Sequence, residues 1–72
     1  MTSIYDIRNN IFELQSMLRR ISLNHNIPLI NPDSIFGPET AEAVRDVQNI
    51  SGIPVTGKVD YLTWTTILLM SQ

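Results

Sequence analysis

The chain of 72 residues contains no cysteine and only one histidine, His25. Without cysteine, disulfide bonds and thiolate metal sites are excluded. A lone histidine needs carboxylate partners at close spacing to hold a metal, and the sequence places no such cluster around it. We therefore predict no metal site and no cofactor, and we expect His25 to be a loop or helix-capping residue.

Long apolar runs are also missing. The longest, Ile67–Met70, is far too short to cross a bilayer. The opening MTSIYDIRNN has neither a basic region nor a continuous apolar stretch, so it does not resemble a signal peptide. The sequence predicts no membrane partner, and any work outside the cell would require export by a larger parent protein, by lysis, or by a signal removed from this chain.

An excess of positive charge is absent as well. Five basic and seven acidic residues leave a net charge of −2. Nucleic-acid-binding domains usually carry a basic stripe. The one basic pair, Arg19-Arg20, is expected to serve the carbonyls and dipole at a helix end. We therefore predict no nucleic-acid partner.

The residues that are present indicate one globular domain over residues 1–72. Hydrophobic residues make up 43% and charged residues 17%, a composition typical of folded proteins. A domain this small buries only about 60% of the surface that its unfolded chain exposes. Its core must therefore be efficient.

Apolar residues at alternating spacings of three and four predict a first helix with one buried face: Ile4, Ile7, Ile11, Leu14, Leu18 and Ile21. Ser3 is the expected N-cap, although Asn9-Asn10 weaken the helix and leave a start near Asn10 as the alternative. Tyr5, Phe12 and Met17 lie off this face and would form an apolar patch if exposed.

Proline and glycine divide the rest of the chain. A loop over residues 24–37 is expected to pack through five apolar anchors: Ile27, Leu29, Ile30, Ile35 and Phe36. The second helix should begin at Gly37-Pro38 and end at Gly52, with Ala41, Val44 and Val47 on its buried stripe and Ile50 as a further candidate.

The third helix should begin after Asp60, an N-cap with Thr63 at the third position. Trp64, Ile67 and Leu68 share one face of this helix, and Trp64 is expected in the core rather than on a sugar.

A weak internal repeat links the two later helices. Residues 33–40 align with residues 56–63 at an offset of 23. Each copy is a turn that places an apolar residue (Phe36 or Val59) in the core and begins a helix. Thr40 and Thr63 fall near the third helical position, where the hydroxyl can bond backbone of the preceding turn. The sequence thus predicts an all-α, compact three-helix bundle with two similar turn-helix units.

Five short motifs in this order resemble the peptidoglycan-binding domain family of bacterial and phage cell-wall enzymes. Their family patterns are V-x-x-L-Q-x-x-L, D-G-x-F-G-x-x-T, A-V-x-x-F-Q, G-L-x-V-D-G-x-V-G and T-W. They match, in turn, Ile11–Leu18, Asp33–Thr40, Ala43–Gln48, Gly52–Asp60 and Thr63-Trp64. The resemblance covers about residues 10–70. It implies a three-helix module without catalytic groups that tethers a hydrolase to peptidoglycan.

Three departures from the family pattern bear on the fold. Ser34 replaces the usual glycine, which suggests a tighter or differently shaped turn. Val47 replaces a frequent phenylalanine, so we expect a smaller core there, with Ile50 or Phe12 filling the space. Asp60 also replaces a glycine, and its role as a helix cap explains the change.

An enzyme is not predicted. The carboxylates nearest to a glycosidase pair are Asp33 and Glu39, which are expected to fix a turn and to favour a helix start. Glu42 and Asp46 should be solvated on the second helix. We also expect no cleft of about 300 Å³ or more in so small a bundle. Gln15 and Gln48 are expected to satisfy buried backbone groups.

The binding hypothesis uses the starts of the second and third helices, whose N–H groups and dipoles can meet a peptidoglycan stem peptide or glycan. Its residues are Ser34, Gly37, Glu39, Thr40, Lys58 and Tyr61, with Arg45 as a secondary position. We expect a monomer, either alone or as a part of a larger hydrolase, located in the cell wall or outside the cell. The alternative is a protein–protein interaction module in a cell-envelope, spore or phage assembly.

Overall fold

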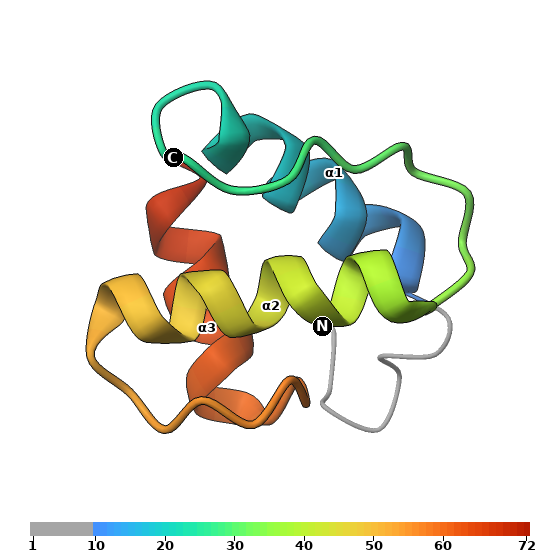
Figure 1. Cartoon of the computed structure of the whole chain (residues 1–72). Helices are drawn as coiled ribbons and strands as arrows, with labels where there is room; N and C mark the ends of the chain where they lie inside the picture. Colours follow the sequence, from blue (N-terminus) through green and yellow to red (C-terminus); the bar gives the residue numbers. More distant parts are fainter. Residues whose placement is uncertain (1–9) are drawn as a thin grey trace.

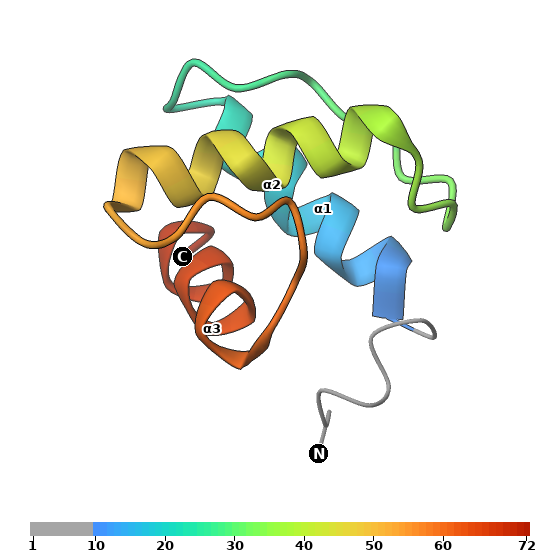
Figure 2. The ribbon, with the colours of Figure 1, turned by 60° about the horizontal axis from the view of Figure 1, so that its bottom comes forward.

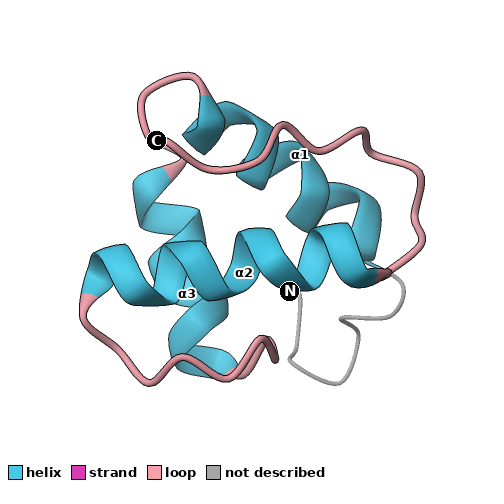
Figure 3. Ribbon diagram, viewed as in Figure 1, coloured by secondary structure: helices cyan, strands magenta, loops and turns pink. Residues whose placement is uncertain are grey.

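The computed structural model describes residues 10–72, which form three helices and, within this range, no strand. They are α1 (Ile11–Ser22), α2 (Pro38–Ser51) and α3 (Tyr61–Met70). Each helix packs against both others, and α2 lies across the other two (Figure 1, Figure 2). Loops make all the connections (Figure 3). The predicted all-α three-helix bundle is confirmed.

The helix α1 begins at Ile11, which agrees with the alternative start near Asn10. The expected contributions of Ser3, Ile4, Tyr5 and Ile7 lie outside the described residues. Buried residues of α1 recur at helical spacing: Leu14, Met17, Leu18 and Ile21.

The placement of Met17 off the main face was wrong, because α1 meets two helices and a loop and needs a wider apolar face. Met17 is only 1% exposed. Phe12 is 56% exposed, as the interaction-module alternative requires, but that alternative loses Met17 from its patch.

The boundaries of α2 follow the local signals. Gly37 is the N-cap, Pro38 is in the first turn, and Gly52 closes the helix with a left-handed φ of 73°. Val44 and Val47 are buried as predicted. Their buried neighbours on the helix are Thr40 and Ala43, so the expected burial of Ala41 was wrong. Ile50 is exposed and does not fill space near Val47.

The helix α3 is capped as predicted: the Asp60 carboxylate accepts a hydrogen bond of 2.8 Å from the backbone N–H of Thr63. Ile67 is fully buried, and Trp64 is half-buried against the core. Leu68 was expected on the same buried face, but it is exposed. The packing of α3 therefore depends on a narrower contact than its composition suggests.

The loop between α1 and α2 folds back along α1. Ile27 and Ile30 are buried and supply its apolar anchors, whereas Leu29 and Ile35 are exposed. Phe36 is 38% exposed, so its predicted role as a core plug was wrong. The reason is that Ile30, at 2% exposure, already fills the interior, while the segment next to Phe36 is held by polar contacts. In the second unit Val59 does pack against the core.

No helix within residues 10–72 has both the length and the apolar character needed to cross a bilayer.

Candidate functional site

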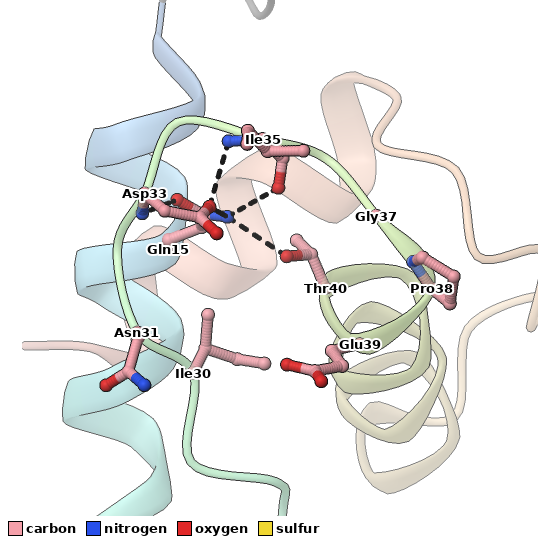
Figure 4. A pocket seen from close by; sticks show the side chains of 9 residues that line it. All are labelled: Gln15, Ile30, Asn31, Asp33, Ile35, Gly37, Pro38, Glu39 and Thr40. Atoms are coloured by element: carbon pink, nitrogen blue, oxygen red, sulfur yellow. Dashed lines mark hydrogen bonds between the residues drawn. The ribbon is translucent and has the colours of Figure 1, made fainter.

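A buried glutamine of α1 fastens the loop that precedes α2. The amide oxygen of Gln15 accepts hydrogen bonds of 2.9 Å from the backbone N–H groups of both Asp33 and Ser34. Its amide nitrogen donates to three oxygens, Asp33 Oδ1 at 3.1 Å, Ile35 O at 2.9 Å and Thr40 Oγ1 at 3.0 Å (Figure 4). One side chain thus joins α1, the loop and α2.

A second glutamine repeats this arrangement one unit later. The amide oxygen of Gln48 accepts hydrogen bonds of 2.9 Å from the N–H groups of Thr56 and Gly57. Its amide nitrogen donates to Thr56 Oγ1 at 3.1 Å, Lys58 O at 3.1 Å and Thr63 Oγ1 at 3.0 Å. We call these two sets of hydrogen bonds the Gln15 clamp and the Gln48 clamp. The prediction that both glutamines satisfy buried backbone is confirmed.

The clamps give the internal repeat a structural meaning. Thr40 and Thr63 accept hydrogen bonds from the clamp glutamines, where the sequence predicted bonds to backbone of the preceding turn. Ser34 has a φ of 65° and its counterpart Gly57 a φ of 75°. The expected change of turn shape at Ser34 was therefore wrong: the serine adopts the left-handed backbone that the family pattern assigns to glycine.

A pocket of about 300 Å³ opens between the Gln15 clamp and the first turn of α2. The expectation that no cleft of this size exists was therefore wrong, because Gln15 holds residues 33–35 of the loop in an arch between α1 and the start of α2 (Figure 4). The lining comes from α1, the loop and α2, and its residues are Gln15, Ile30, Asn31, Asp33, Ile35, Gly37, Pro38, Glu39 and Thr40 (Figure 4).

Two carboxylates line this pocket. Asp33 Oδ1 accepts the backbone N–H of Ile35 at 2.9 Å, which fixes the turn as predicted. The hydrogen bond from Ile35 is the main cause that holds the pKa of Asp33 below its ordinary value, and the bond from the Gln15 amide is the second cause. Glu39 is exposed in the first turn of α2, and its side chain reaches toward Ile30 (Figure 4).

The two helix starts differ in their caps. At the start of α3 the Asp60 carboxylate accepts a hydrogen bond from the N–H of Thr63. This bond is the main cause that lowers the pKa of Asp60, and the Thr63 hydroxyl is the second cause. At the start of α2, Gly37 has no side chain to provide such a cap. The positive end of α2 is therefore more accessible to a ligand than that of α3.

The structure brings three of the seven predicted binding residues together. Gly37, Glu39 and Thr40 line the pocket, although Thr40 is buried and its hydroxyl is engaged by Gln15. Ser34 lies beside them in the loop, with its N–H bound to Gln15.

The other three predicted residues belong to the second unit and do not line the pocket. Lys58 is exposed, and its N–H binds Thr56 Oγ1 at 3.1 Å. Tyr61 is exposed at the start of α3. The Arg45 side chain lies against Gly57, where an added Cβ would come within 3.0 Å of Arg45 Nη1.

The pocket also contains four residues that were not predicted to bind: Ile30, Asn31, Ile35 and Pro38. The sequence predicted that Arg19 serves the carbonyls of its own helix. Instead, Arg19 Nη1 donates to Ile30 O at 3.3 Å and to Asn31 Oδ1 at 3.1 Å, which fastens the loop to α1. The sequence signal for these contacts was an apolar segment between two prolines. It indicated that the loop packs onto the helices, but it did not indicate which residues the loop contacts.

Hydrogen bonds act on the pKa of Asp33 and Asp60 in the direction opposite to that of a glycosidase acid. A glycosidase needs one carboxyl group with a raised pKa to act as the acid. In Asp33 and Asp60 the hydrogen bonds described above lower the pKa, which is the opposite of what that role requires. Among residues 10–72, no group of three histidine, aspartate or glutamate side chains could hold a metal ion.

The clamped loop, the pocket and the uncapped start of α2 all lie within one continuous segment that matches a known family. Residues 8–67 match the model of the peptidoglycan binding domain family. The chain belongs to this family, as the five motifs indicated. Searches of curated proteins and of solved structures found no match.

Proposed function

We propose that this chain is a non-catalytic module that binds peptidoglycan and holds an attached or associated hydrolase at the cell wall. The observation that carries the proposal is the family match over residues 8–67. The pocket beside the Gln15 clamp supports it, because the pocket joins an apolar wall to polar groups, as ligand sites usually do.

The first turn-helix unit, residues 33–40, is proposed as the main contact. Glu39 is exposed in this unit and Gly37 is half-buried, Ser34 shapes the loop, and Thr40 supports the floor through Gln15. Because Thr40 is buried, it acts by positioning rather than by direct contact.

Lys58 and Tyr61, with Arg45 in second place, are proposed to extend this surface across the second unit. All three are exposed. Lys58 and Arg45 can meet the carboxylates of stem peptides, and the Tyr61 ring can serve as a platform for a sugar.

Affinity for a single muropeptide should be weak, because a shallow, open pocket removes little surface from water. Many identical sites on one polymer offset this weakness, because a second attachment nearby becomes effectively intramolecular. The module therefore suits the targeting of a hydrolase that must remain on the wall while moving over it.

The direct test is sedimentation with purified sacculi at low salt. We expect the folded chain to pellet with sacculi and to remain in solution with cellulose, a β-linked glycan without peptides. Recovery of all the protein in the supernatant with sacculi would contradict the proposal. A turbidity assay on the same sacculi should show no lysis, and a fall in turbidity would contradict the non-catalytic assignment.

A further inference from the structure

We propose that the pocket beside the Gln15 clamp binds the ammonium end of a diamino acid side chain in an uncross-linked stem peptide. This inference rests on the proposed function and specifies which chemical group of the polymer is recognised. It is more specific than the binding hypothesis drawn from the sequence, in which the N–H groups and dipoles of the helix starts meet a stem peptide or glycan.

The charge of the pocket favours a cation. Its charged lining residues are Asp33 and Glu39, and both are acidic. The hydrogen bonds that Asp33 receives from Gln15 and Ile35 go to Oδ1, so a ligand ammonium can approach through Oδ2. The nearby cation, Arg19, is held by Asn31 and the carbonyl of Ile30 and does not line the pocket.

The helix dipole opposes this preference but is the smaller effect. The uncapped start of α2 contributes roughly half of a positive elementary charge. Two ionised carboxylates contribute four times as much negative charge. The net field in the pocket therefore favours an ammonium over a carboxylate.

The walls of the pocket match the rest of such a side chain. Ile30, Ile35 and Pro38 provide an apolar surface next to the carboxylates. A diamino acid presents a methylene stem ending in an ammonium, the amphipathic form that packs along apolar walls with its charge at a polar end. Since Gln15 and Arg19 already hold the loop, little ordering is needed on binding.

The second unit lacks these features at matching positions. At the offset of 23, Asp33 corresponds to Thr56 and Glu39 to Leu62, while Ile35 corresponds to Lys58. The acidic pair is thus lost and a cation is gained. Recognition of an ammonium should belong to the first unit alone.

The test compares native sacculi with sacculi whose free amino groups have been acetylated. Acetylation removes the ammonium charge and leaves the stem-peptide carboxylates in place. We expect the full chain to bind acetylated sacculi at least fivefold more weakly than native sacculi. Equal binding to both would overturn the inference and leave peptidoglycan binding intact, whereas no binding to native sacculi would contradict the proposed function itself.

Charge-removing variants locate the effect. Glu39→Gln and Asp33→Asn should each weaken binding to native sacculi roughly two- to fivefold, as expected for exposed ion pairs. Asparagine keeps an oxygen that can accept the N–H of Ile35. The matched control is Glu42→Gln, which removes the same charge from an exposed position of α2 outside the pocket.

The pocket variants should also distinguish less well between native and acetylated sacculi. Glu39→Gln is expected to bind acetylated sacculi about as well as the wild type does, while Glu42→Gln keeps the wild-type ratio of native to acetylated binding. Equal losses in Glu39→Gln and Glu42→Gln would show a non-specific effect of net charge and would overturn the assignment of the pocket.

Discussion

The two turn-helix units share one internal construction but differ at the surface. Each is held by a buried glutamine that accepts hydrogen bonds from two backbone N–H groups and donates one to the hydroxyl of a threonine in the following helix. In the first unit the turn borders an acidic pocket and an uncapped helix. In the second, Asp60 caps the helix and Arg45 covers the turn. The two clamps thus hold the same kind of turn, while the side chains around each turn differ.

The largest effect should come from removing a clamp. Gln48→Met keeps the volume but leaves the N–H groups of Thr56 and Gly57 without their acceptor, and the Gly57 bond is buried. Because an unsatisfied buried polar group costs about 1–3 kcal/mol, we expect a loss of about 2–4 kcal/mol in the free energy of unfolding. Urea denaturation followed by circular dichroism measures this change.

Gln15→Met is the matched variant in the first unit. Its hydrogen bonds to the turn are only partly buried, so water can replace them more easily. The loss should be smaller than for Gln48→Met. A larger loss of unfolding free energy for Gln15→Met than for Gln48→Met would contradict this explanation by burial.

The next effect concerns the left-handed position of the second unit. Gly57→Ala forces an L side chain into a φ of 75° and brings its Cβ against Arg45. We expect destabilisation of about 1–2 kcal/mol, the usual cost of that backbone region. The double variant Gly57→Ala/Arg45→Ala, measured by thermal unfolding, should regain only the stability that Gly57→Ala loses through the clash with Arg45. Full recovery in the double variant would show that backbone strain contributes nothing.

The corresponding position of the first unit should respond in the opposite direction. Ser34→Gly relieves a serine held at a φ of 65° while keeping its N–H bond to Gln15. We expect a gain of about 1 kcal/mol or less, because glycine also has more freedom to lose on folding. A urea midpoint below that of the wild type would contradict this assignment.

The smallest effect is the dependence of stability on pH. The pKa values of Asp33 and Asp60 are lowered by hydrogen bonds that exist only in the folded chain. Their contribution is fully present above the unfolded pKa of about 3.9 and is lost as the pH falls through the lower folded values. The urea midpoint should therefore fall between pH 5 and pH 2, and the fall should be shallower in Asp60→Asn. An identical pH profile in that variant would exclude Asp60 as a contributor.

Local signals were sufficient to predict both ends of α2 and the start of α3. Pro38, Gly52 and Asp60 act within one or two turns of their own position, and each has the predicted role. The sequence was a poorer guide to which residues around each helix are buried. Met17 and Ala43 are buried because of what packs against them, and a single helical pattern does not contain that information.

The pocket could not have been predicted from spacing alone. Its lining joins α1, the loop and α2 through hydrogen bonds that span 18 to 25 residues. Whether Ile30 or Phe36 fills the interior decides whether the loop stands open, and both are plausible from sequence. The sequence did place Gly37 and Glu39 in this region, because Gly37 belongs to the family pattern and Glu39 follows the predicted start of the second helix.

The most direct test of the central claim is chemical-shift mapping of the labelled chain with soluble muropeptides that carry a free diamino acid. We predict that the largest shift changes fall on residues 30–40, with smaller changes over residues 56–62 at the start of α3. Changes confined to the second unit, or none at muropeptide concentrations well into the millimolar range, would contradict the account.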